Sequence, residues 1–135
     1  MTIKTENYNL FLDDERVPSS VSWMEIPDNI EWTIVRTYSE FVAIIIKCGL
    51  PNSISFDHDL GNSAYKEFFR AHAGDKIINY GNIREQTGYD CAKWLAQYCI
   101  DNKVPIPQYY LHSKNYIGCE NIRSILESAR KVIAS

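Results

Sequence analysis

In Tyr8-Asn9-Leu10-Phe11-Leu12-Asp13-Asp14-Glu15-Arg16, a short apolar run stops in a cluster of acids. A second stretch, Ser53-Ile54-Ser55-Phe56-Asp57-His58-Asp59, repeats this design. Short apolar runs bounded by charge are typical of buried strands. Because parallel strands of an open α/β sheet present their carboxyl ends to one crevice, we expect the two acidic clusters to converge on one ligand.

The segments around these two runs alternate between strand and helix. β-Branched and aromatic residues predict two more strands, over Trp32–Tyr38 and Gln108–His112. One helix is expected from Ser39, as its N-cap, to Cys48, with Gly49 as its C-cap. Further helices are expected at Ala64–His72, at Thr87–Asn102 and from near Gly118 onward. Such alternation predicts a three-layer α/β fold with a mostly parallel sheet of about four strands.

Composition narrows the classes of function. The chain has 135 residues, about the length of one domain, so we expect residues 1–135 to form a single domain. A net charge of −3 gives no general attraction to nucleic acid or anionic membranes. The four cysteines form no Cys-x-x-Cys pair, and no apolar run approaches the roughly 20 residues that span a bilayer. We therefore expect a cytoplasmic protein with reduced cysteines and no membrane partner.

The connection over residues 62–87 is long for a compact domain, so we expect it to form an insertion. Connections of this kind often form lids or binding loops, and a plain surface insertion fits the sequence equally well. Its aromatic residues could grip a protein partner; they include Tyr65, Phe68, Phe69 and Tyr80.

The acidic strand ends suggest metal-dependent chemistry on phosphate. Clustered carboxylates suit Mg²⁺ or Mn²⁺, and the expected ligands are Asp13, Asp14 and Asp57. Because side chains alternate along a strand, one of Asp13 and Asp14 should bind directly and the other indirectly. An aspartate could attack phosphorus, or His58 or His112 could act as an acid or base. The alternative is that these acids face solvent or cap backbone amides.

Other polar residues could complete a phosphate site. Asp59 shares a face with Asp57 if the strand continues, which makes it a second candidate for chemistry. Arg16 and Arg36 are candidate phosphate clamps, although either could simply pair with the acids beside it.

Two predicted helix starts carry further candidates. Ser113 and Asn115 could bind an anion at a helix N-terminus, or only cap that helix. Asp90 follows Thr87 at the spacing of a capping box, which favours a structural role over substrate binding.

Four motifs combine these residues. They are Leu10-Phe11-Leu12-Asp13-Asp14-Glu15-Arg16-Val17-Pro18, Ser55-Phe56-Asp57-His58-Asp59-Leu60-Gly61, Thr87-Gly88-Tyr89-Asp90-Cys91-Ala92-Lys93-Trp94 and His112-Ser113-x-Asn115-x-x-Gly118-x-x-Asn121-Ile122. Together they resemble the cyclic-phosphate-processing receiver-like family over nearly the whole chain. The resemblance implies a receiver-like (flavodoxin-like) fold and a phosphoacceptor pocket adapted to cyclic phosphate ends of RNA or nucleotides.

The resemblance also implies roles for single residues. Asp13 and Asp14 match the metal-binding acids of a receiver, Asp57 its phosphoacceptor and Ser113 its hydroxyl residue. The family-specific additions match His58, Asp59, Asp90 and His112. Two features depart from the family pattern: Tyr116 stands where proline is usual, and the connection over residues 62–87 is longer. No fifth strand with a receiver's lysine is expected, which argues against phosphorelay signalling.

The favoured function is a metal-dependent phosphoesterase or phosphotransferase acting on cyclic or terminal phosphates of nucleotides or RNA ends. Its expected chemical groups are Asp57, His58, Asp59 and His112, and its expected substrate contacts are Arg16, Arg36, Asp90, Ser113 and Asn115. The alternative is a non-enzymatic receiver-like module that binds a nucleotide or a protein partner. A phosphoacceptor labelled by small phosphodonors is the third and weakest hypothesis.

Overall fold

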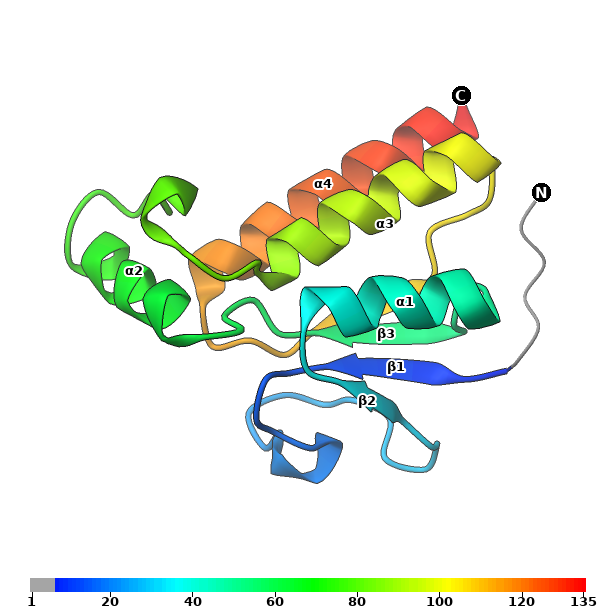
Figure 1. The fold of residues 1–135 in the computed structure, drawn as a ribbon, viewed down its shortest axis with the longest axis horizontal. Helices are drawn as coiled ribbons and strands as arrows, with labels where there is room; N and C mark the ends of the chain where they lie inside the picture. The colour runs from blue at the N-terminus through cyan, green and yellow to red at the C-terminus, as the bar shows by residue number, and fades with distance from the viewer. Residues whose placement is uncertain (1–6) are drawn as a thin grey trace.

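Four short parallel strands form one sheet in the order β2-β1-β3-β4 (Figure 1). The computed structural model describes residues 7–135. The strands are β1 Asn9–Leu12, β2 Thr33–Val35, β3 Ser53–Phe56 and β4 Gln108–Leu111. Parallel pairing throughout confirms the predicted receiver-like α/β class.

One face of the sheet carries the apolar core. The helices are α1 Tyr38–Cys48, α2 Asn62–Ala73, α3 Gly88–Asn102 and α4 Tyr116–Ala134, with short 3-10 turns η1 Pro18–Ser20 and η2 Tyr80–Asn82. Helices α1, α3 and α4 pack on this face (Figure 1). Alternate strand residues point into the core and are fully buried, as a period of two requires: Leu10, Leu12, Ile54 and Phe56.

The other face is covered by irregular chain. The crossover from β1 to β2 contains only the turn η1 and runs beneath the sheet (Figure 1). Its Trp32 meets Phe11 and Tyr110 edge to face, with ring centroids 6.1 and 6.5 Å apart. The third layer is therefore a loop packed by aromatic rings, and it can carry side chains toward the carboxyl end of the sheet.

Two predicted element boundaries are wrong by a few residues. Strand β2 ends at Val35. The backbone amide of Arg36 donates to the Glu40 carboxylate at 2.7 Å and so does not continue the hydrogen bonding of the sheet. The N-cap of α1 is then Thr37, whose hydroxyl accepts from the Glu40 amide, and not Ser39. Gly49 closes the helix with φ of 84°, as predicted.

Helix α4 begins at Tyr116, close to the predicted start near Gly118. The Asn115 side chain caps the helix by accepting the Gly118 amide at 2.8 Å. Helix α3 begins as predicted, with a capping box between Thr87 and Asp90. All four cysteines are buried and form no disulfide.

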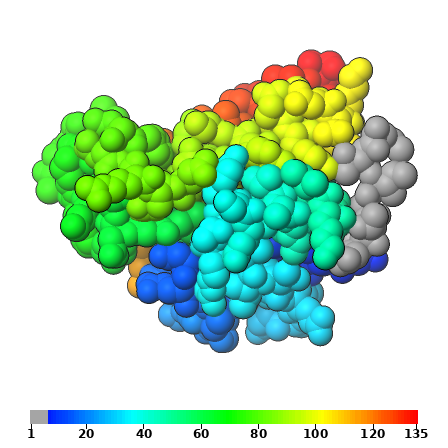
Figure 2. All heavy atoms as spheres, viewed as in Figure 1, coloured from blue at the N-terminus to red at the C-terminus, as the bar shows by residue number. Residues whose placement is uncertain are grey.

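Helix α2 and turn η2 form a lobe that stands out beyond the carboxyl ends of the strands (Figures 1 and 2). Glu67 holds the lobe together by accepting two bonds from the Arg70 guanidinium, at 2.9 and 2.8 Å. It also accepts from the Asn79 amide and the Asn82 side chain, both at 2.8 Å. Across residues 7–135 the helices are all too short or too polar to cross a membrane.

Candidate functional site

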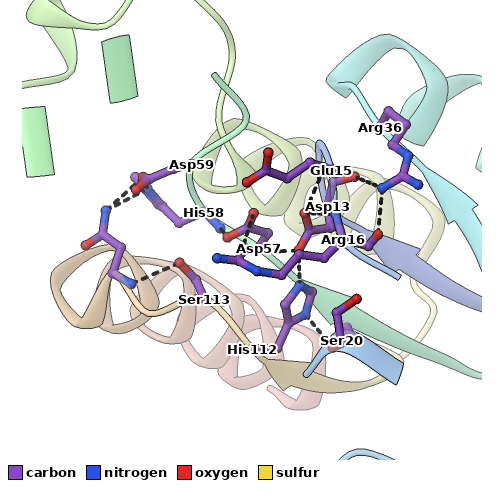
Figure 3. Close-up of polar contacts among 12 residues, drawn as sticks. Asp13, Glu15, Arg16, Ser20, Arg36, Asp57, His58, Asp59, His112 and Ser113 are labelled. Carbon is purple, nitrogen blue, oxygen red and sulfur yellow. Dashed lines mark hydrogen bonds and ion pairs between the residues drawn. The ribbon is translucent and has the colours of Figure 1, made fainter. Parts of the chain in front are cut away.

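The first residue after each of the strands β1, β3 and β4 is held by the neighbouring strand. Asp13, Asp57 and His112 each donate a backbone amide to the last carbonyl of an adjacent strand, over 2.9 to 3.1 Å. These hydrogen bonds extend the sheet by one residue beyond each strand. The three side chains therefore project from a rigid edge of the sheet. The predicted convergence of the strand ends is thus present (Figure 3).

Asp13 is fully buried and strongly hydrogen-bonded. Its Oδ1 accepts the amides of Glu15 and Arg16 at 3.0 and 2.8 Å, and its Oδ2 faces His112 Nε2 at 3.0 Å. Burial alone would raise the pKa of Asp13, but the bonds from His112 and the two amides outweigh it and lower the pKa. Asp13 is therefore an anion in the interior.

His112 lies behind Asp13, away from the pocket. Its Nδ1 meets Ser55 Oγ at 2.7 Å, and its ring stacks on Phe11 at 4.5 Å. Burial lowers the pKa of His112, although Asp13 opposes the shift. The two partners assign the tautomer, since Nε2–H donates to the carboxylate and Nδ1 accepts from the hydroxyl.

Asp57 lies on the pocket side of Asp13 and is 3% exposed. Burial, followed by the charge of Asp13, raises the pKa of Asp57 to about 8, while a hydrogen bond from Ser113 opposes this shift. Asp13, Asp57 and His112 each place a possible ligand atom within 4.8 Å of the others. Because His112 donates its Nε2–H to Asp13, the two carboxylates are the groups that could hold a metal ion. Asp14 is outside this group at the exposed rim, where partial burial and the charge of Asp13 raise its pKa to about 6.

A second histidine forms a parallel arrangement with Asp59. His58 is fully buried, with Nδ1 2.6 Å from Asp59 Oδ1 and Nε2 2.9 Å from the hydroxyl of Tyr80. Tyr80 in turn accepts from Asn121 at 3.0 Å, so its proton points to His58. His58 Nδ1–H then donates to Asp59, which also accepts from Asn115 at 2.9 Å. Both histidines thus connect a hydroxyl to an aspartate.

Two cations stand over one tryptophan at the rim. Arg16 Nη1 lies 3.6 Å from Asp13 Oδ2 and 3.9 Å from Asp57 Oδ2. The Arg16 guanidinium and the Lys114 ammonium lie 5.1 and 4.4 Å from the centroid of Trp23. Trp23 is fixed because its indole N–H donates to the carbonyl of His112 at 2.8 Å. Sequence reasoning missed Trp23, which lies in an irregular crossover without periodicity.

The pocket above these groups has a volume of about 270 Å³. One end is polar and holds four acids, Asp14, Glu15, Asp57 and Asp59, with the cations Arg16 and Lys114 and the polar residues Ser113 and Asn115. The other end is walled by Tyr65 and Phe68 of α2. Asp13, His58 and His112 support this lining from behind.

Two residues that were predicted to contact substrate, Arg36 and Asp90, lie outside the pocket. Arg36 donates from one Nη1 to the carbonyls of Asp13 and Arg16, at 3.1 and 2.6 Å, and so braces the loop after β1 (Figure 3). Asp90 accepts the Thr87 amide at 2.7 Å as part of the α3 cap. Neither side chain lines the pocket, and both stabilise the backbone around it.

A parallel receiver-like sheet with acids after β1 and β3 and a hydroxyl residue after β4 defines a receiver-like class of protein. The model of the cyclic-phosphate processing receiver domain family matches residues 8–128. The chain belongs to this family, which confirms the resemblance found in its sequence. No curated protein and no solved structure gives a significant match.

Proposed function

We propose that this protein is a metal-dependent phosphoesterase or phosphotransferase that acts on cyclic or terminal phosphates of nucleotides or RNA ends. The observation that carries the proposal is the meeting of Asp13, Asp57 and His112 within 4.8 Å beside the cation Arg16. Membership of a cyclic-phosphate processing family supports it. A phosphate fits a pocket that offers both acids for a metal and cations for its own oxygens.

The donor set suits Mg²⁺ or Mn²⁺. Asp13 and Asp57 would hold the ion directly, and Asp14 at the rim would hold it through water. The raised pKa of Asp57 supports this fit, since burial beside the charge of Asp13 favours a proton or a cation there. When bound, such an ion neutralises charge on the phosphate and makes phosphorus easier to attack. His112 orients Asp13 by its Nε2–H bond.

Side chains of the pocket would bind the phosphate and transfer the proton. Arg16 and Lys114 would bind phosphate oxygens, and the Ser113 hydroxyl, which donates to Asp57 in this structure, would rotate to donate to one of them. When a cyclic phosphate opens, a water oxygen bonds to phosphorus, one phosphorus–oxygen bond to ribose breaks, and a proton passes from the water to the released oxygen. We assign Asp59 to accept and return this proton, with His58 holding its carboxylate in place.

Turnover of 2′,3′-cyclic nucleotides and cyclic-ended RNA by the purified protein with Mg²⁺ or Mn²⁺ tests the proposal. The wild type should release the monophosphate, and Asp57→Asn should lose at least about 100-fold in kcat/KM while staying folded, because a carboxylate ligand of the metal is lost. Asp28→Asn, an exposed acid of the crossover, is the matched control and should keep full activity. A wild-type protein that neither binds nor cleaves these compounds would contradict the proposal.

A second candidate function is a binding module without turnover. One observation favours it: both histidines have both ring nitrogens engaged, so only carboxylates remain to move protons. Such a module would bind a 2′,3′-cyclic nucleotide with metal and leave it intact. Product analysis of the wild type distinguishes the two functions directly.

A further inference from the structure

The aromatic wall of the pocket is not used by the chemistry at the acidic end. Tyr65 and Phe68 lie on one side of α2, and Tyr65 is 52% exposed. Together with three neighbours they form a cluster of rings with centroids 5.0 to 5.8 Å apart: Tyr65, Phe68, Phe69, His72 and Tyr116. Exposed rings in such number on a small protein mark a binding surface.

We propose that Tyr65 and Phe68 form a stacking site for the nucleobase of a ligand whose phosphate lies at the acidic end. This inference rests on the proposed function, because it assumes that a phosphate occupies the polar end of the same pocket. The rings and the groups for phosphate, among them Arg16 and Ser113, line one continuous cavity. A nucleotide is a ligand that joins a flat aromatic base to a phosphate over such a short span.

The charge of the molecule makes stacking necessary for useful affinity. The net charge is −3, and the cations that line the pocket are Arg16 and Lys114. Phosphate contacts alone therefore supply little binding free energy. Stacking of one base on an aromatic side chain contributes about 1 to 3 kcal/mol, which corresponds to roughly a 5- to 150-fold gain in affinity.

The aromatic wall is fixed before any ligand arrives. The Ala64 amide donates to Glu85 Oε2 at 2.8 Å, and the Ser63 hydroxyl donates to the same carboxylate, so the first turn of α2 is tied down. His72 meets the Tyr116 hydroxyl at 2.8 Å and joins α2 to α4. The two departures from the family pattern, Tyr116 and the long connection, thus meet in one cluster. A preorganised wall lowers the entropy cost of binding.

The position of each ring favours a base over a protein partner. Phe69 and Ile77 are 54% and 64% exposed but do not line the pocket, whereas Tyr65 and Phe68 do. A protein that docked on the lobe would use the outward rings at least as much as the pocket rings. A base attached to a phosphate in the pocket reaches only Tyr65 and Phe68.

Two probes test this stacking site: 2′,3′-cyclic AMP and glycerol 1,2-cyclic phosphate, which carries the same ring phosphate without a base. Binding and kcat/KM with metal are measured for the wild type, Tyr65→Ala and Phe68→Ala. Tyr65→Phe, which keeps the ring, and Phe69→Ala, which removes a ring outside the pocket, are the controls. We expect the wild type to prefer cyclic AMP at least about tenfold, since one base stacks.

Tyr65→Ala and Phe68→Ala should remove most of this preference and leave the glycerol compound unaffected, while both controls behave as wild type. Equal use of the two probes by the wild type overturns the stacking site alone, as does equal loss of both probes in Tyr65→Ala. Failure of the wild type to bind or cleave either probe overturns the proposed function together with the stacking site. Loss in Phe69→Ala equal to that in Tyr65→Ala indicates a different occupant, such as a protein, and overturns the proposal.

Discussion

At the scale of single residues, the site consists of two similar relays placed side by side. Ser55 donates to His112, which donates to Asp13, and Tyr80 donates to His58, which donates to Asp59. In each relay a buried imidazole fixes a carboxylate by a charge-assisted bond, which is the usual way to position a ligand or a base. The imidazoles are thus positioning groups. Asp59 lines the pocket, and Asp13 lies behind the lining close to Asp57.

Trp23 is the residue on which the cationic rim depends. Trp23→Phe should cost about 1 kcal/mol in unfolding free energy, because the indole N–H bond to His112 is lost while the ring remains. Trp23→Leu should in addition raise the KM for a 2′,3′-cyclic nucleotide by about 3- to 10-fold, because Arg16 and Lys114 each lose a cation–π contact of roughly 0.5 to 1 kcal/mol. Thermal unfolding and steady-state kinetics measure the two effects separately.

Trp94→Leu is the matched control for this prediction, since Trp94 packs on Phe41 away from the pocket. It should destabilise the protein without changing the KM. If Trp23→Leu and Trp94→Leu have the same effect on KM, Trp23 does not position the cations.

The sequence predicts those parts of the site that follow from strand periodicity. Asp13 and Asp57 could be placed together because each follows a strand, and parallel strands end at one edge. Trp23 and Tyr80 could not be placed, because both lie in irregular segments whose path depends on packing. The role of Arg36 could not be predicted for the same reason. Its position in the sequence predicts a cation near the acids, but only the folded structure shows that it donates to backbone carbonyls.

At the scale of elements, two helices start against the loop after β3. Gly88 at the start of α3 lies so close to Asp57 that a Cβ there would overlap its carbonyl oxygen, and the Gly88 amide donates to the His58 carbonyl at 2.8 Å. Gly118 in the first turn of α4 lies equally close to the ring of His58. The absence of a side chain at these glycines lets the helix ends reach the site.

Substitution of Gly88 or Gly118 by alanine should therefore lower the unfolding free energy and disturb the geometry of the site. Gly88→Ala should lower the unfolding free energy by about 3 kcal/mol or more, because the overlap is with backbone that cannot move freely. Gly118→Ala should cost somewhat less, since the His58 ring can shift, but it should also lower kcat by moving Asp59. Gly81→Ala, whose Cβ would meet only the Asn79 side chain at 3.1 Å, is the control. Equal stability of all three variants would contradict the close packing.

The α2 and η2 lobe depends on one buried carboxylate. The bonds from Arg70 lower the pKa of Glu67 to about 2, from an ordinary value of 4.5. Between these values the unfolded lobe takes up a proton that the folded lobe does not, so this stability is complete above about pH 4.5 and is lost as the pH falls toward 2. The lobe should therefore open in acid before the sheet does.

Glu67→Gln tests this pH dependence. At neutral pH the variant should lose about 1 to 3 kcal/mol of local stability, seen as faster amide hydrogen exchange over residues 62–87. The difference from the wild type should shrink as the pH falls below about 4.5, because protonated Glu67 also loses its bonds. Glu25→Gln, on the exposed crossover, should leave exchange in the lobe unchanged. A difference that stays constant with pH would show that the charge of Glu67 is not responsible.

At the scale of the whole molecule, the net charge is −3, and the pocket places two cations, Arg16 and Lys114, among its acids. Several cations elsewhere are paired with acids: Arg70 with Glu67, Arg123 with Glu120 and Arg130 with Glu127. Arg16 and Lys114 stand over Trp23 at the rim and face the cavity. This arrangement favours a single phosphate group at the pocket, because a net charge of −3 gives a longer polyanion no general attraction.

This distribution predicts that the length of an RNA ligand matters little. A 2′,3′-cyclic mononucleotide and an RNA of about 20 nucleotides with the same cyclic end should bind within roughly threefold of each other, because a net charge of −3 gives phosphates outside the pocket no general attraction. The slope of log affinity against log salt should be about −0.7 to −1.4, as expected for one or two phosphate contacts on a single strand. Fluorescence titration of both ligands at several salt concentrations, with metal held constant, measures both quantities.

Lys114→Gln should reduce the slope by about 0.7, whereas Lys47→Gln at the end of α1 should leave it unchanged. A steep slope, or an affinity that rises with each added nucleotide, would instead indicate a basic track and a function along RNA chains rather than at their ends.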